Sequence, residues 1–194
     1  MAKHTTEAFI TPQATLSFPQ IFVPKLNKRG KEEFTAVLLI PKTADMSGFK
    51  AAVAEVINRA FGHLNAAQQK ALRRGIRDGD APNSKGNVFE GFPGHYVINV
   101  KSQYKPGTVD EKVQPVLDAK KFYAGCKVIA QLIAYDYDVD GNTGVAFGLQ
   151  NIQFIGDGAK LGNASQDAAS VFTAVPGSAA ATATGDSADD FLGG

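Results

Sequence analysis

Apolar and polar residues alternate along several stretches of this chain, a pattern typical of β-strands. Residues 14–24 have this pattern, and Pro19 within them indicates an edge strand or a bulge. Residues 33–40 are apolar at nearly every position, which predicts a strand buried on both faces. The intervening residues 25–31 are basic and include Gly30, which can adopt a positive φ. We therefore expect a β-hairpin with a basic tip.

Two segments after this hairpin have the apolar spacing of α-helices. The first covers residues 46–61 and is ended by Gly62. The second begins at Asn65, which forms a variant of the capping box with Gln68, and ends near Gly75. Both segments follow the second predicted strand, so we expect them to form one helical insertion.

The second half of the chain returns to strand patterns. Residues 76–95 are rich in Gly, Pro, Asn and Asp, and a loop of this length tends to be functional or mobile. Strands are expected at residues 96–103, 126–138 and 145–155, and residues 140–144 predict a hairpin turn between the last two. About five strands with few helical crossovers predict a mainly β fold with a helical insertion (α+β). A small closed antiparallel barrel suits this order better than a parallel sheet does.

The net charge of +1 hides a division along the chain. All 20 Lys and Arg residues lie within residues 1–160, whose net charge is +5. Residues 161–194 contain four acidic residues and no Lys or Arg. We expect one folded domain over residues 1–160. The difference in charge between this domain and residues 161–194 indicates nucleic-acid binding with an acidic tail.

The tail joins a linker to a short acidic and aromatic tip. Residues 161–185 are mostly Ala, Gly, Ser and Thr, a composition typical of a flexible linker. The tip can dock on a basic-rimmed pocket of another protein, or compete with nucleic acid for the protein's own basic groove. A disordered, solubilising terminus is the alternative. The predicted partner-binding residues are Asp186, Asp189, Asp190, Phe191 and Leu192.

Several classes of protein do not suit this sequence. Cys126 is the single cysteine, so no intrachain disulfide can form, and we expect it to be a small buried apolar residue. No run of about 18 apolar residues predicts a membrane span, and residues 1–7 lack the apolar core of a secretory leader. We expect a soluble, cytoplasmic protein.

The search for catalytic and metal-binding residues gives weak candidates. Asp136 to Gly141 match the first six positions of a calcium-binding loop, but Phe147 stands where the loop needs Glu. Asp78 and Asp80 lack a third acidic residue at a defined spacing and are expected in a turn. We therefore predict no metal, no cofactor and no enzymatic activity. A metal-dependent nuclease that uses these acids remains an alternative, as does a virion or scaffold protein that ignores nucleic acid.

Basic residues interleave with aromatic ones in several places, as on a surface that binds single-stranded nucleic acid. Cations follow the phosphates, and unpaired bases stack on aromatic rings. Tyrosines are the better candidates for exposure, whereas Phe18, Phe34, Phe49, Phe61, Phe147 and Phe154 are expected in the core. The candidate DNA-binding residues are Lys25, Lys28, Arg29, Lys31, Arg73, Arg74, Tyr96, Lys101, Tyr104, Lys105, Lys120, Lys121, Tyr123, Lys127, Tyr135 and Tyr137.

Several phrases occur together that resemble one known family. They are RDGD at 77–80, GHYVIN at 94–99, FYAGC at 122–126, AYD at 134–136, GNTGVAFGL at 141–149 and IQF at 152–154. The series is similar to phage-encoded single-stranded DNA-binding proteins with an OB fold, over roughly residues 10–162. The resemblance implies a five-stranded antiparallel OB barrel that coats single strands in the cytoplasm of an infected bacterium. Duplex DNA and RNA would be weaker ligands.

The resemblance also implies roles for the protein in the host cell. It implies work in phage DNA replication, recombination and repair, with a tail that recruits replication proteins such as a polymerase or a helicase. In bacterial proteins of this type the chain stops at the aromatic residue, but here Leu192, Gly193 and Gly194 follow Phe191. That difference puts capture of the tail through its terminal carboxylate in doubt, and it leaves competition with DNA untouched.

Overall fold

The computed structural model describes residues 4–27, 29–82, 86–139 and 141–162. The predictions on Lys28, on Asp140 and on the tail concern residues outside these ranges. The predicted tail residues are Asp186, Asp189, Asp190, Phe191 and Leu192. Within the described residues no helix is long and apolar enough to cross a membrane.

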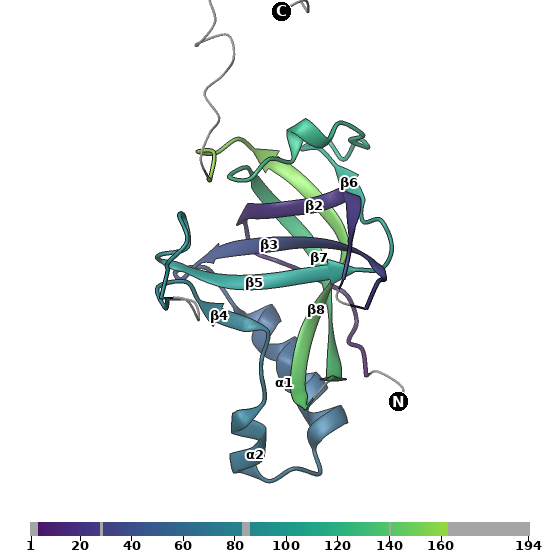
Figure 1. Ribbon diagram of the computed structural model, residues 1–194, viewed down its shortest axis with the longest axis vertical. Coiled ribbons are helices and arrows are strands. Elements are labelled where there is room, and N and C mark those ends of the chain that lie inside the picture. Colours follow the sequence, from purple (N-terminus) through teal and green to yellow (C-terminus); the bar gives the residue numbers. More distant parts are fainter. Residues whose placement is uncertain (1–3, 28, 83–85, 140, 163–194) are drawn as a thin grey trace, which may run out of the picture. The chain divides into compact units, whose positions relative to one another are not determined.

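A single mixed β-sheet dominates the structure (Figure 1). Its eight strands are β1 (Phe9–Ile10), β2 (Ala14–Leu26), β3 (Glu32–Pro41), β4 (Ile76–Asp78), β5 (His95–Ser102), β6 (Gly107–Val109), β7 (Lys127–Val139) and β8 (Asn142–Gly156). The predicted hairpin is β2 and β3, and Gly30 in its turn has φ 72°. The prediction of a mainly β protein with a helical insertion is confirmed.

Five strands pair in a closed circuit. β2 pairs with β3, β3 with β5, β5 with β8, β8 with β7, and β7 with β2. The short strands add to this five-strand circuit, because β1 pairs with β7, β4 with β5, and β6 with β8. The prediction of five strands is therefore wrong for the sheet as a whole. The prediction of an antiparallel barrel is also not fully met by the sheet, because β8 runs parallel to β5 and β6.

Two helices separate β3 from β4 along the chain. α1 (Ser47–Phe61) buries one apolar face, and its Phe49 ring lies 5.2 Å from the ring of Phe147 on β8. α2 (Ala66–Ala71) begins with the predicted capping box of Asn65 and Gln68. α2 ends at Ala71 rather than near Gly75, because the backbone becomes extended at Leu72. A 3-10 turn, η1 (Ala119–Lys121), precedes β7.

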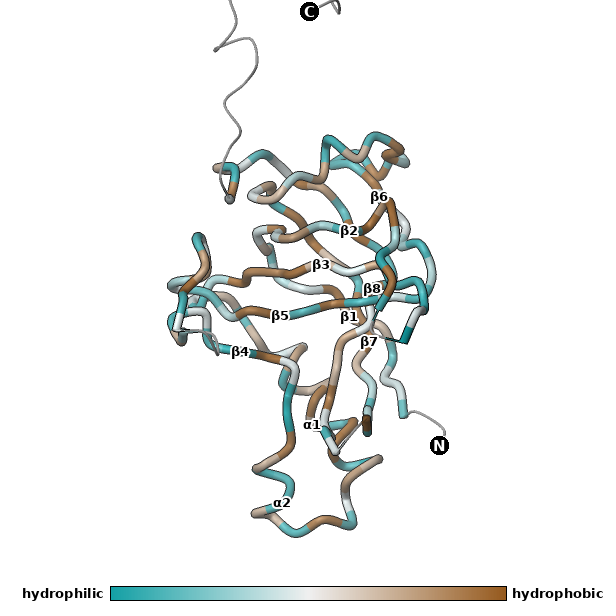
Figure 2. The backbone as a smooth tube through the Cα atoms, viewed as in Figure 1, coloured by the Kyte–Doolittle hydropathy of each residue, from teal (hydrophilic) through white to brown (hydrophobic). Residues whose placement is uncertain are grey.

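The core lies between the strands and α1. The strand predicted at residues 126–138 turns one face to this core, since Val128, Ala130, Leu132 and Ala134 of β7 are all buried. The apolar run of β3 reaches full burial at its end, where Leu38, Leu39 and Ile40 are inaccessible, and the hydrophobic colouring of β3 in Figure 2 follows it.

Five of the six phenylalanines predicted to be buried are buried, and the exception is Phe18, which is 55% exposed. The register of β2 against β3 shifts between Ser17 and Gln20, and Phe18 has φ 45°. This is the bulge that Pro19 indicated. It reverses the alternation of β2, so that Ile21 enters the core and Phe18 does not.

Candidate nucleic-acid interface

A groove of about 970 Å³ runs across the face of β3 and β5 that points away from the core. Thr35 and Val37 of β3 line it beside their cross-strand partners Lys101 and Asn99 of β5. Because side chains alternate along a strand, the intervening residues are buried and leave these four accessible to a ligand. The groove is therefore built on β3 and β5, two adjacent strands of the five-strand circuit.

Two tyrosines of β7 form part of the groove wall. Tyr135 and Tyr137 stand opposite Ala146 and Gly144 of β8, and both tyrosines are half-buried. The small partners leave room beside the aromatic rings. Burial, with the negative charge of Glu33 as a smaller cause, raises the pKa of Tyr135 to about 12. The Tyr135 hydroxyl therefore stays protonated in the physiological range, so its ring offers a neutral π face.

Three arginines come from the segment that follows α2. The backbone N–H of Arg73 donates to the Thr143 carbonyl over 3.3 Å, and Val145 N–H donates to the Arg73 carbonyl over 2.8 Å. These bonds hold the segment against the start of β8. Arg73, Arg74 and, from β4, Arg77 all line the groove as a result.

Glycine is required where this segment meets β8. Gly75 has φ 70°, and a Cβ there would lie 2.9 Å from the Val145 carbonyl oxygen and 3.0 Å from the Phe147 ring. A Cβ on Gly144 would collide with the backbone of Arg73. Close backbone contact between two segments about 70 residues apart thus positions the arginines.

The charge of the groove is strongly positive. Four cations, Arg73, Arg74, Arg77 and Lys101, line it together with one carboxylate, Glu33. Cations beside aromatic rings are the combination that binds the phosphates and bases of a single strand. The arrangement can hold a polyanion with unpaired bases.

The groove brings together five of the predicted DNA-binding residues: Arg73, Arg74, Lys101, Tyr135 and Tyr137. The other described candidates do not line it: Lys25, Arg29, Lys31, Tyr96, Tyr104, Lys105, Lys120, Lys121, Tyr123 and Lys127. Lys28 is outside the described residues. The helical placement of Arg73 and Arg74 is corrected, because both follow the end of α2 at Ala71, and Arg73 pairs with Gly144 of β8.

Several of the candidates outside the groove have structural contacts. The Tyr123 hydroxyl donates to the Asp157 carboxylate over 2.9 Å, and Lys127 Nζ donates to the Thr15 hydroxyl over 2.8 Å. Lys121 Nζ pairs with Glu111 at 3.2 Å and also lies 4.7 Å from the centroid of a core phenylalanine ring. These three side chains therefore take part in contacts within the folded protein.

Sequence reasoning missed several residues of the groove, among them Phe18, Arg77 and Asn99. Arg77 belongs to the same basic stretch as Arg73 and Arg74, which is a signal that could have identified it. Asn99 falls on the polar face of a correctly predicted strand. For Phe18 the signal was Pro19, which indicated a bulge or an edge strand but not that the Phe18 ring would be exposed.

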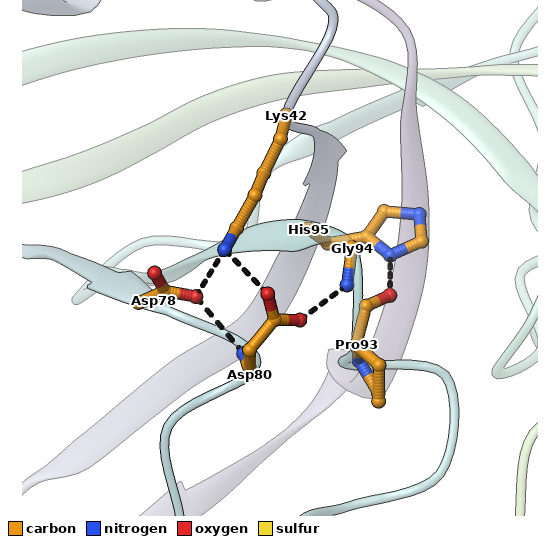
Figure 3. Close-up of polar contacts among 6 residues, drawn as sticks. All are labelled: Lys42, Asp78, Asp80, Pro93, Gly94 and His95. Atoms are coloured by element: carbon orange, nitrogen blue, oxygen red, sulfur yellow. Dashed lines mark hydrogen bonds and ion pairs between the residues drawn. The ribbon is translucent and has the colours of Figure 1, made fainter.

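Asp78 and Asp80, two of the acids of the nuclease alternative, lie in a braced turn outside the groove (Figure 3), whereas Asp136 and Asp138 belong to β7. Lys42 Nζ contacts Asp78 at 2.5 Å and Asp80 at 2.7 Å, and Asp80 also accepts from the Gly94 N–H over 2.6 Å. The hydrogen bond from Lys42 is the largest cause that lowers the pKa of each carboxyl. Among the described residues, no group of three or more His, Cys, Asp or Glu side chains is placed to hold a metal ion.

Comparison with known proteins gives one family. The model of the family described as Enterobacter phage Enc34, ssDNA-binding protein, matches residues 7–191. No curated protein matches the chain.

Solved structures with a similar fold are also phage proteins. The single-stranded DNA-binding protein from bacteriophage Enc34 superposes with a TM-score of 0.62 at 18% identity, over 84% of this chain and 89% of that one. The same protein in complex with ssDNA gives 0.64 at 19% identity, over 80% and 89%. The single-stranded DNA-binding protein gp2.5 of bacteriophage T7 gives 0.56 at 16% identity, over 94% and 100%.

Proposed function

This chain belongs to the family of the single-stranded DNA-binding protein of Enterobacter phage Enc34, and we propose that it binds and coats single-stranded DNA with little sequence preference. Its family and its structural neighbours are binding proteins and not enzymes, as the sequence predicted. The observation that carries the proposal is the groove, which Arg73, Arg74, Arg77 and Lys101 line together with two half-buried tyrosines.

The five-strand circuit supports a finer description of the fold. We propose that β2, β3, β5, β7 and β8 form an OB barrel, to which β1, β4 and β6 are additions. OB folds bind oligonucleotides on the face of their second and third strands. In this chain those strands are β3 and β5, where the groove lies. A site of this kind covers about 4–16 nucleotides.

The chemistry of the groove favours a single strand of any sequence. Arginine and lysine bind phosphate oxygens, which every nucleotide carries, and each base offers a π face for stacking. Duplex DNA and RNA carry the same phosphates, so we expect them to bind more weakly rather than not at all.

The test is the salt dependence of binding, measured by fluorescence anisotropy of a labelled single strand. Replacing Arg73 and Arg74 together by Ala should flatten the log–log slope by about 1.4, since each phosphate contact on a single strand contributes about 0.7. The matched control replaces Lys112 and Lys120, which are exposed and outside the groove, and it removes the same charge. An equal effect of both double variants would show that overall charge matters and that the groove is not the interface.

We also propose a role for the protein in the infected cell and a function for its acidic tail. Coating of single strands would serve replication, recombination and repair of a phage genome in the cytoplasm of the infected bacterium. The acidic tail, residues 186–194, would compete with DNA for the groove and recruit a polymerase or a helicase. A chain that ends at Gly162 should bind single-stranded DNA more tightly at low salt. Equal affinity of the two chains would argue against competition by the tail.

A further inference from the structure

Two phenylalanine side chains beside the groove are exposed to solvent although they touch each other. Phe18 is 55% exposed and Phe89 is 44% exposed, and their ring centroids lie 5.8 Å apart in an edge-to-face contact. Both also contact Phe92, which is 6% exposed. Large apolar rings exposed as a pair, rather than singly, indicate a surface that binds a ligand.

The rings of Phe18 and Phe89 are supported by a buried ring and by hydrogen bonds that close the segment carrying Phe89. Phe92 packs with Leu39 and Val97 in a small core cluster, so it anchors the other two rings. The segment that carries Phe89 and Phe92 is closed at its ends, because Gly79 N–H donates to the His95 carbonyl over 2.9 Å. The Lys42 and Asp80 contacts in Figure 3 brace the same closure. The pair is thus presented by a supported backbone.

The position of this pair continues the groove. Phe18 lines the groove, whereas Phe89 and Phe92 line an adjoining hollow of about 280 Å³. Arg77 lines both, so a cation stands at the passage from one to the other. A chain that passes Arg77 from the main groove into the hollow has Phe18 on the groove side and Phe89 on the hollow side.

The backbone of Phe18 supports a role in binding. Its φ of 45° is one that a bulky residue rarely adopts, and glycine would take it without strain. The exposed ring is not held there by burial in the core. Strained conformations of this kind occur where a side chain is presented for function.

We propose that Phe18 and Phe89 form a stacking platform for an unpaired nucleobase, and that Arg77 binds the phosphate between that base and those in the main groove. This inference rests on the proposed function and adds a base-binding site to it. In a duplex the faces of a base are covered by its neighbours in the stack, so only a single strand can use the platform. The platform therefore discriminates single strands from duplexes, which the arginines alone do not.

A tryptophan reporter tests the site directly, because the chain contains no Trp. In the full-length Phe89→Trp variant, an oligothymidylate should quench the indole fluorescence with the same titration curve that anisotropy gives. The control is Tyr104→Trp, since Tyr104 is 81% exposed and outside both the groove and the hollow. Quenching at position 89 and not at 104 supports the platform. No quenching at 89, while anisotropy shows binding, overturns it.

Affinity gives the second readout. Replacing Phe18 and Phe89 by Ala should weaken single-strand binding about 5- to 150-fold for one stacked base, at every salt concentration and without change of slope. Duplex binding should not change, and Phe89→Leu alone serves if the double variant does not fold. An unchanged single-strand affinity, or an equal loss for duplex, overturns the platform and leaves the proposed function standing. If the wild-type protein itself binds no single strand, the proposed function falls and the platform with it.

Discussion

Lys101 Nζ lies 3.3 Å from Glu33 Oε1 inside the groove, so one groove cation already has a partner in the free protein. Glu33 is 20% exposed and Lys101 is 48% exposed. A phosphate that approaches Lys101 must compete with this carboxylate, and the carboxylate also repels it. Glu33 therefore opposes binding at the position where the four cations favour it, and it limits how tightly a single strand is held.

Removing this carboxylate should strengthen binding. The Glu33→Gln variant keeps the size of the side chain and frees Lys101 for a phosphate. We expect higher single-strand affinity at low salt and a log–log salt slope steeper by about 0.7, the value of one added phosphate contact. Anisotropy titrations across a salt series measure both. In a Lys101→Ala background the same change should no longer steepen the slope, and a persisting effect would show that Glu33 acts through another group.

The contact of Gly144 with the segment after α2 gives a prediction about the arginines. In Gly144→Ala the new methyl group collides with the Arg73 carbonyl, so the segment must shift away from β8. We expect a loss of stability of about 1–3 kcal/mol, as in overpacked cores, and weaker DNA binding. The matched control is Gly156→Ala, at the other end of β8, where a Cβ meets nothing within 4 Å. Normal binding by a folded Gly144→Ala protein would mean that Arg73 and Arg74 do not need this placement.

The strain at Phe18 predicts an order of stability between two variants. Phe18→Ala and Phe18→Gly both remove the ring, but only glycine accepts φ 45° without cost. The glycine variant should therefore be more stable than the alanine variant by about 1 kcal/mol, after the greater entropy of its unfolded chain is counted. Thermal unfolding should show it as about 2–4 °C in Tm for a chain of this size. A lower Tm for the glycine variant would mean that the bulge relaxes when the ring is lost.

Much of the fold follows from local patterns in the sequence. The alternation of β7 placed Val128 and Leu132 in the core, and the capping box at Asn65 marked the start of α2. β1, β4 and β6 were missed, since strands of two or three residues are too short for alternation to be recognised. Their pairing depends on the longer strands beside them.

The site was predicted less completely, for a physical reason. Tyr135 and Lys101 could be assigned because they lie on strands in which the alternation of apolar and polar residues shows which side chains face away from the core. Arg73 reaches the groove through backbone bonds to β8, and such contacts between distant segments leave no local pattern. Phe18 was assigned to the core because regular alternation was assumed along β2, and the bulge between Ser17 and Gln20 breaks that alternation.

The ion pairs of the turn in Figure 3 predict that the stability of the folded protein depends on pH. Lys42 lowers the pKa of Asp80 below its usual value near 3.8, so the folded state favours the carboxylate. A lowered pKa contributes stability that is present above about pH 4 and is lost as the pH falls through the folded-state value. Asp80→Asn should therefore lower the Tm at pH 7, and the difference from wild type should shrink below pH 4. A difference that persists unchanged at pH 3 would mean that Asp80 acts through its shape and not its charge.

Burial of Cys126 predicts slow reaction with thiol reagents. The side chain is inaccessible at the start of β7, and burial raises the pKa of its thiol to about 11. At pH 8 the folded protein should contain at least about 100-fold less thiolate than the unfolded chain, whose cysteine has a pKa near 8.5–9. Iodoacetamide should therefore label the native protein that much more slowly than the protein in urea, and the single cysteine makes the measurement unambiguous.

The stability that the neutral thiol contributes is complete below about pH 9 and is lost as the pH rises toward 11, so labelling should accelerate there. Fast labelling of folded protein at pH 8 would mean that β7 separates from β2 at this end, next to the pairing of Ala14 with Val128 that closes the five-strand circuit.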